Sequence, residues 1–345
     1  MSTSTSTPTT PSAIAPLLEV SARLGKNPRL VQAATGNTSL KRDGVLWIKA
    51  SGRWLADAIR DEIFFPLSLE ETLRRIEAGV DPSAHFGVPG RALRASVETA
   101  MHAVLPFRVV LHVHSVNVIA WAVRQDGQAE LARRLEGIAW QWIPYTPSGL
   151  PLARAVSTAM AGNPQARVLV LANHGLVVGG DDCAEAEALL SEVERRIEIA
   201  ARGIPEPAWQ VLSRIAGEST WRLPEARSIH ALGTDPTVHR IVSGGILYPC
   251  QRIFLTPRAR SFPPDVDRNE ILCTDEPFVI IKEAGTLVRQ GLGASELAIL
   301  IGLAEILLRI PETAPVQYLS REDIQDLRCA NVYNYRELAQ RSIAI

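Results

Sequence analysis

The sequence has few cysteines and no excess of charge of either sign. Its four cysteines, Cys183, Cys250, Cys273 and Cys329, lie far apart without a Cys-x-x-Cys pair, which argues against a zinc ribbon and a disulfide framework. We therefore expect reduced thiols in a cytoplasmic protein. The 36 basic and 37 acidic residues leave a net charge of −1 at pH 7, and no run of Lys or Arg forms a basic patch. Nucleic acid is not an expected partner.

Long apolar runs are absent too. No stretch reaches the roughly 20 residues that a membrane-spanning helix requires, so no membrane contact is expected. Residues 1–11 are uncharged and rich in Ser, Thr and Pro, and they lack the basic and apolar regions of a signal peptide. They are expected to form a disordered tail. The remaining composition, 46% hydrophobic and 21% charged, is that of a globular protein with one large or two modest domains.

Two histidines two residues apart form the most informative motif. His112 and His114 stand in the segment Arg108-Val-Val-Leu-His-Val-His, which predicts a buried strand. Side chains at positions i and i+2 point to one face of a strand, so the two imidazoles can converge on a metal ion. Two polar rings on a buried face need partners in any case, and two satisfied core histidines remain the alternative.

Two further segments carry side chains that suit the same ion. A predicted helix before the strand places Glu98 and His102 four residues apart on one face. Downstream, a β-rich apolar run ends at Asn173-His174-Gly175. Three imidazoles and a carboxylate form a tetrahedral set for zinc if the fold brings them together, whereas His102 is expected to be structural. The complete set would be His112, His114, His174 and Glu98.

Two loops rich in glycine and small polar residues precede these segments. Arg42-Asp43-Gly44 predicts a hairpin between two short strands, and one loop lies on either side of it. Such loops can bind a phosphate or carboxylate through backbone N–H groups and side chains, but Gly-Asn and Ser-Gly are also common turn pairs. The candidate side-chain donors in these loops are Thr35, Asn37, Thr38 and Ser51.

Helices and strands are expected to alternate up to residue 202, and Pro205-Glu206-Pro207 is the clearest break. We expect a metal-binding domain over 12–204 and a smaller C-terminal α/β extension of unknown role over 205–345. No internal repeat of fixed period is apparent. The predicted helices cover 13–24, 67–78, 95–104, 182–202 and 296–308, and the predicted strands include 62–66, 109–113, 138–144, 168–171, 176–178, 278–281 and 286–288.

Together the motifs resemble the class II aldolase/adducin family over residues 30–202. They occur in the family's order and comprise Gly36-Asn37-Thr38-Ser39, Lys49-Ala50-Ser51-Gly52, Glu98 with His102, His112-Val113-His114 and Ala172-Asn173-His174-Gly175. The segment 45–57 is most similar to the aldolase half of bifunctional rhamnulose-phosphate aldolase/alcohol dehydrogenases. No GxGxxG fingerprint follows it, so no dehydrogenase half is expected.

The resemblance implies an α/β fold: a three-layer α/β/α sandwich around a mostly antiparallel sheet, assembled as a homotetramer. It also implies that three histidines bind the metal together with Glu98, which serves as the acid/base once substrate displaces it. Val97 replaces a hydroxyl residue that many members carry before the glutamate, and Tyr145 and Tyr248 are candidate proton donors. The implied metal ligands are His112, His114, His174 and Glu98, and the implied anion-binding residues are Gly36, Asn37, Ser51, Gly52 and Ser96.

The implied activity is metal-dependent retro-aldol cleavage of a phosphorylated ketose or a related sugar acid. A Zn²⁺ ion, or Mn²⁺, Fe²⁺ or Co²⁺ in its place, would stabilise the enediolate that forms when the carbon–carbon bond breaks. Decarboxylation, epimerisation or dehydration of a sugar acid or sugar phosphate shares this chemistry and remains an alternative. A non-catalytic, adducin-like binding protein is the third.

Overall fold

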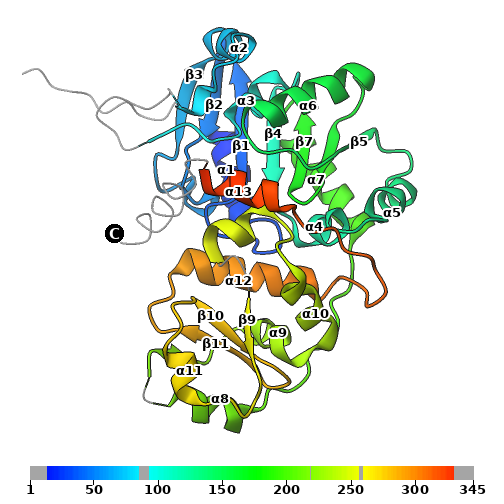
Figure 1. Ribbon diagram of the computed structural model, residues 1–345. Helices are drawn as coiled ribbons and strands as arrows, with labels where there is room; N and C mark the ends of the chain where they lie inside the picture. Colours follow the sequence, from blue (N-terminus) through cyan, green and yellow to red (C-terminus); the bar gives the residue numbers. More distant parts are fainter. Residues whose placement is uncertain (1–13, 85–92, 218, 256–258, 330–345) are drawn as a thin grey trace, which may run out of the picture.

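A computed structural model describes residues 14–84, 93–217, 219–255 and 259–329, so the expected tail over 1–11 lies outside the described residues. Two lobes are visible in Figure 1, with helix α12 (Ala294–Leu307) lying between the larger sheet and the smaller one. None of the helices in the described ranges combines the length and the apolar character needed to cross a membrane.

The larger lobe is built on a seven-stranded sheet with the order β3-β2-β1-β4-β7-β6-β5. Only the β5–β6 pair is parallel, and the other neighbours run antiparallel. The mostly antiparallel sheet is therefore confirmed. Its strands are β1 (Asn37–Arg42), β2 (Val45–Lys49), β3 (Phe64–Ser68), β4 (Val109–Val113), β5 (Trp140–Ile143), β6 (Val168–Leu171) and β7 (Gly175–Gly180).

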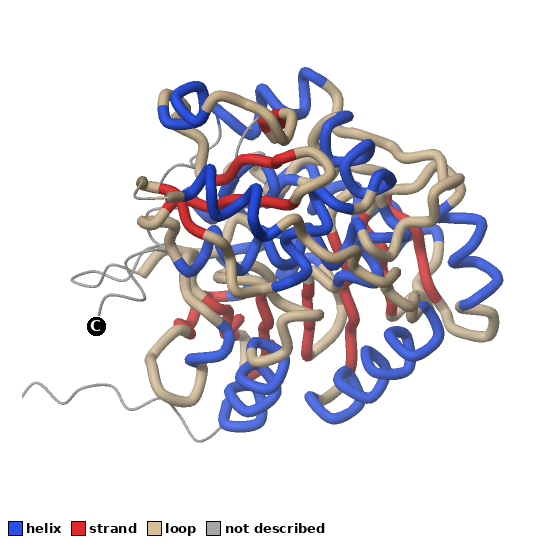
Figure 2. Tube along the Cα trace, turned by 90° about the horizontal axis from the view of Figure 1, so that it is seen from below, coloured by secondary structure: helices blue, strands red, loops and turns tan. Residues whose placement is uncertain are grey.

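Helices cover both faces of this sheet. Successive side chains of β4 point to opposite sides, so each set of helices packs against alternate residues of the strand. Val109 and Leu111 belong to the core beneath α1 and α7, whereas Val110 packs with Met101 and Val156 of α3 and α6. Figure 2 shows a row of strands with helices lined up along one side. The predicted α/β/α sandwich is confirmed. Its helices are α1 (Ala15–Gly25), α2 (Leu69–Glu77), α3 (Thr99–Val104), α4 (Val116–Ala122), α5 (Gly127–Arg134), α6 (Leu150–Gly162) and α7 (Cys183–Ile197).

Two predicted helices extend at least four residues beyond the observed ones. The helix predicted from residue 95 begins at Thr99, because Ala95 is held in a β-bridge with Ala50. The helix predicted to reach Arg202 ends at Ile197, and beyond it the Arg202 N–H donates to the Leu308 carbonyl at 2.9 Å. In both cases a tertiary backbone contact overrides the local helical pattern.

The smaller lobe repeats the connectivity of the second half of the larger one. Its sheet has the order β8-β11-β10-β9, in which β9–β10 is parallel and the other pairs are antiparallel, as in β4-β7-β6-β5. The hairpins β6–β7 and β10–β11 both turn through a residue with positive φ, Asn173 (52°) and Glu283 (63°), and each leads into a helix. The strands are β8 (Trp221–Arg222), β9 (Arg260–Phe262), β10 (Phe278–Ile281) and β11 (Gly285–Arg289), and the remaining helices are α8 (Trp209–Ala216), α9 (Ala231–Thr234), α10 (Pro236–Gly244), α11 (Arg268–Leu272) and α13 (Arg321–Cys329).

One hydrophobic core crosses the junction between the two lobes. Val116 and Ile119 of α4 belong to the same buried cluster as Leu300 and Leu303 of α12. The backbone links the lobes as well, since the Gln317 N–H donates to the Val123 carbonyl at 2.7 Å. The smaller lobe is therefore packed against the elements that follow β4.

Candidate metal centre

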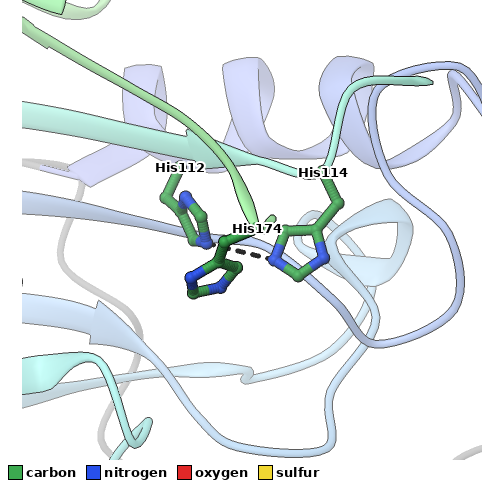
Figure 3. A group of neighbouring side chains, drawn as sticks. All are labelled: His112, His114 and His174. Carbon is green, nitrogen blue, oxygen red and sulfur yellow. Dashed lines mark hydrogen bonds between the residues drawn. The ribbon is translucent and has the colours of Figure 1, made fainter. Parts of the chain in front are cut away.

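The fold brings together the three histidines that the sequence separates. His112 lies on β4, His114 follows that strand, and His174 occupies the turn between β6 and β7. Each offers a ring nitrogen within 4.8 Å of the others, and all three side chains are buried. The imidazoles converge on one point in Figure 3. This convergence arises because β4 and β7 are paired neighbours, with His112 opposite Val177.

The imidazoles turn ring nitrogens toward one another. The His112 Nδ1–H donates to the Leu176 carbonyl at 3.0 Å, which leaves its Nε2 free, 3.1 Å from the His114 Nε2. Burial, reinforced by the proximity of His112, lowers the pKa of His114 well below its ordinary value. Buried imidazoles that face one another at this distance fit a divalent cation, which would take up a nitrogen lone pair from each ring.

Glu98 lies at the edge of this cluster, at the position that precedes the first turn of α3. Its Oε1 is 3.0 Å from the His174 Nε2 and 3.4 Å from the His112 Nε2. Burial opposes ionisation, but His112 and His174 outweigh it and hold the pKa of Glu98 well below its usual range. The structure therefore places a carboxylate beside the three imidazoles.

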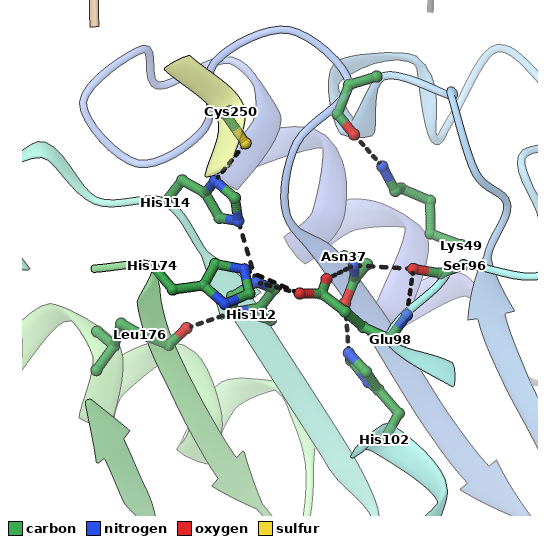
Figure 4. A network of polar contacts seen from close by, with 11 residues as sticks. Asn37, Lys49, Ser96, Glu98, His102, His112, His114, His174, Leu176 and Cys250 are labelled. Atoms are coloured by element: carbon green, nitrogen blue, oxygen red, sulfur yellow. Dashed lines mark hydrogen bonds and ion pairs between the residues drawn. The ribbon is translucent and has the colours of Figure 1, made fainter. Parts of the chain in front are cut away.

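A chain of buried polar contacts fixes Glu98 from the opposite side (Figure 4). The Asn37 Nδ2 donates to the Glu98 Oε2 at 2.6 Å, and the Asn37 Oδ1 accepts a hydrogen bond from the His102 Nε2. The His102 Nδ1 then accepts from the Ser39 hydroxyl at 2.7 Å. Burial lowers the pKa of His102 to about 3, so its ring is neutral. His102 thus orients Asn37 and does not contact the histidine cluster.

A cavity of about 100 Å³ opens beside Glu98 and is lined by both lobes. The loops after β2 and before α3 meet there, because the Ser51 N–H donates to the Arg94 carbonyl at 3.0 Å. Val97, which is 42% exposed, adds an apolar side chain. The lining residues predicted from the sequence are Thr35, Gly36, Asn37, Ser51, Ser96, Glu98, His114 and His174.

Other candidates lie elsewhere. The Thr38 hydroxyl is 2.6 Å from the Ser21 hydroxyl under α1, so Thr38 does not face the cavity. Gly52 follows Ser51 with a φ of 73° and is not among the residues that line the cavity. Within the described part of the chain, neither Tyr145 nor Tyr248 lines the cavity. Their role as proton donors stays a prediction.

Several residues that line the cavity were given no role by the sequence analysis, and two of them carry a titratable side chain. Lys49 is 1% exposed, and its Nζ donates to the carbonyls of Ala34 (2.6 Å) and Arg53 (2.7 Å). Burial, opposed by the charge of Glu98, lowers the pKa of Lys49 to about 7. Its signal was a lysine inside an apolar strand. Cys250 reaches the cavity from the smaller lobe, and no sequence pattern marks it.

Part of this chain is similar in sequence to known proteins. The family described as class II aldolase and adducin N-terminal domain matches residues 16–201. The uncharacterized oxidoreductase YuxG of Bacillus subtilis (strain 168) is 28% identical over 187 residues, or 50% of this chain and 27% of that protein. This chain thus spans only about a quarter of that relative's length.

Solved structures similar to this one include the following two. The N-terminal class II aldolase domain of a conserved protein from Thermoplasma acidophilum is 25% identical with a TM-score of 0.46, and the match covers 57% of this chain and 100% of that one. L-fuculose-1-phosphate aldolase from Thermus thermophilus is 21% identical with a TM-score of 0.38, covering 53% of this chain and 89% of that one.

Proposed function

This chain belongs to the class II aldolase and adducin family, and we propose that it is a zinc-dependent lyase that performs retro-aldol cleavage of a sugar phosphate or sugar acid. The observation that carries the proposal is the carboxylate of Glu98, held 3.0 Å from a buried group of three histidines and facing a cavity. A binding protein without catalysis has no need of this arrangement, in which a buried carboxylate lies beside three converging imidazoles.

When bound, a divalent cation supplies Lewis-acid stabilisation of the negative charge that develops on substrate oxygens. Three neutral imidazoles as ligands leave the charge of the ion intact, which favours this role. His112, His114 and His174 would hold the ion. Glu98 would complete the set before substrate enters, and would then accept or donate the proton at the carbon next to the substrate carbonyl.

The far side of the cavity supports binding of the anionic end of the substrate. Ser51, Ser96 and the backbone around Gly36 supply neutral hydrogen-bond donors there, and Lys49 supplies a positive charge. Val97 makes one position apolar where the family often has a hydroxyl. A carboxylate, which has fewer oxygens than a phosphate, therefore suits this cradle as well as a phosphate does.

The homotetramer implied by the family is part of the proposal and is tested by size measurement in solution.

The proposal is tested by incubating the zinc-loaded protein with ketose phosphates and with hydroxy-keto acids, and by identifying the products by mass spectrometry. Formation of two products, an aldehyde and a three-carbon carbonyl compound that can enolise, supports cleavage. Release of CO₂, a change of stereochemistry or loss of water would instead assign one of the alternative reactions of the same site.

Lys49 gives the proposal a pH dependence. A protonated Lys49 attracts an anionic substrate, and it loses its proton as the pH rises through about 7. We therefore expect kcat/KM for an anionic substrate to fall by about tenfold above that pH, since a hydrogen bond to a charged group is lost. Lys49→Gln should show the low value at every pH.

Lys41→Gln is the matched control, because Lys41 is partly buried and does not line the cavity. Burial lowers the pKa of Lys41 to about 8. The fall in kcat/KM should persist in this variant. If Lys41→Gln removes the fall and Lys49→Gln does not, the assignment to Lys49 is wrong.

A further inference from the structure

We propose that the smaller lobe is an integral part of the metal centre, in which Cys250 and the backbone carbonyls of Leu247 and Gln317 hold two of the three histidines in coordinating positions. This inference rests on the proposed metal site and adds residues that position its ligands. Both contacts come from segments that follow the Pro205-Glu206-Pro207 break.

The first contact reaches His114. The Cys250 Sγ lies 3.4 Å from the His114 Nδ1, and Cys250 is 5% exposed. The other ring nitrogen, Nε2, faces the cluster, 3.1 Å from the His112 Nε2. If Nε2 held an ion, the ring proton would stay on Nδ1, and the Nδ1–H would donate to the Cys250 sulfur. This is the arrangement by which an outer hydrogen bond fixes the tautomer and orientation of a metal-binding histidine. In Figure 4, Cys250 approaches from the opposite side of the ring to Glu98.

The second contact fixes the turn that carries His174. The Asn173 Nδ2 donates to the Leu247 carbonyl and to the Gln317 carbonyl, each at 2.8 Å. Asn173 also has a φ of 52°, a conformation that brings His174 back toward β4. Its side chain is 3% exposed, so these bonds are made in a low-dielectric interior where leaving the amide unpaired is costly. The smaller lobe therefore restrains the backbone at the third ligand.

The two sheets share a strand order, but the described residues of the smaller lobe form no metal site of their own. Its hairpin β10–β11 repeats the hairpin β6–β7, and Ala284 stands before Gly285 where His174 stands before Gly175. Strand β8, the counterpart of β4, carries Trp221 and Arg222 in place of a histidine. No cluster of metal-binding side chains occurs in the smaller lobe within the described residues. The smaller lobe thus has the same strand order as the second half of the larger sheet and packs against the histidines of the larger lobe.

Two variants test the inference, each with a matched control. Cys250→Ala removes the sulfur, and Cys273→Ala makes the same change at an exposed cysteine of the same lobe. Asn173→Gly removes the side-chain amide but keeps a residue that accepts positive φ. Glu283→Gly removes the side chain at the corresponding position of the hairpin β10–β11, where φ is also positive. The dissociation constant for Zn²⁺ is measured by chelator competition, and the visible spectrum is recorded after loading with Co²⁺. Thermal melting of the chelated proteins shows whether each variant is folded.

We expect Cys250→Ala and Asn173→Gly each to weaken zinc binding by about 10- to 100-fold and to alter the Co²⁺ spectrum, the range typical for loss of an outer-shell partner. The two controls should stay within about twofold of the unmodified chain. The inference is overturned if both test variants bind zinc as tightly as their controls with an unchanged Co²⁺ spectrum. An unmodified chain that binds no metal would overturn the proposed function as well, so the two failures are distinguishable.

Discussion

Replacing Glu98 with Gln is expected to lower kcat by about 10²- to 10⁴-fold, because a neutral amide cannot accept or donate the proton at the reacting carbon. The metal content should remain near that of the unmodified chain, since the three histidines still supply ring nitrogens within 4.8 Å of one another. Gln has nearly the shape of Glu, so the cavity keeps its form. Single-turnover kinetics with the zinc-loaded protein measures the loss directly.

A matched control exists on α7. Glu194 is partly buried, and burial raises its pKa, so its carboxyl group tolerates replacement by a neutral amide. It accepts a hydrogen bond from Asn117 at 3.1 Å and does not line the cavity. Glu194→Gln should therefore keep turnover within a few-fold. Retained turnover in Glu98→Gln, with metal bound, would show that another group moves the proton.

The sequence predicted best those elements whose pattern is short and local. The strands predicted at 109–113, 168–171 and 278–281 have the same limits as β4, β6 and β10. The hairpin at Asp43-Gly44 is also confirmed. In each case neighbouring residues determine the result. The convergence of His112 and His114 follows from the same two-residue period.

The sequence failed where distant backbone decides the outcome. The helix limits near Glu98 and Arg202 are set by contacts with Ala50 and Leu308, which no window of local sequence contains. Cys250 contacts a residue 136 positions away, and periodicity carries no information about such a pair. Sequence reasoning also treated Asn37 as an anion donor, whereas its amide contacts Glu98 in the structure. Whether it also binds substrate stays a prediction.

The repeated connectivity escaped notice because few residues preserve it. The segments Leu171-Ala-Asn-His-Gly-Leu-Val-Val and Ile281-Lys-Glu-Ala-Gly-Thr-Leu-Val share a glycine and a valine at the same spacing. A hairpin with positive φ before glycine needs little more than these residues and an apolar flank. The fold can therefore recur while the chemistry disappears, as it does at Ala284.

Replacing His114 with Ala is expected to reduce bound metal from near one ion per chain to below about a tenth of that amount. Two imidazoles and a carboxylate remain, but the cluster loses the ligand that Cys250 orients. Metal content is measured by mass spectrometry on protein purified without chelators or affinity metals. His239→Ala is the control, because His239 bonds to Ser261 in the smaller lobe, away from the cavity.

The same pair of variants should differ in stability, because an ion that binds only the folded state stabilises it by mass action. At a free concentration about 1,000 times its dissociation constant, this contributes about 4 kcal/mol. Zinc should therefore raise the melting temperature of the unmodified chain and of His239→Ala, and should leave His114→Ala unchanged. If neither the unmodified chain nor the control responds to zinc or contains metal, the buried histidines have a structural role and an adducin-like binding function becomes the better proposal. A response in His114→Ala equal to that of the control would instead place the ion elsewhere in the protein.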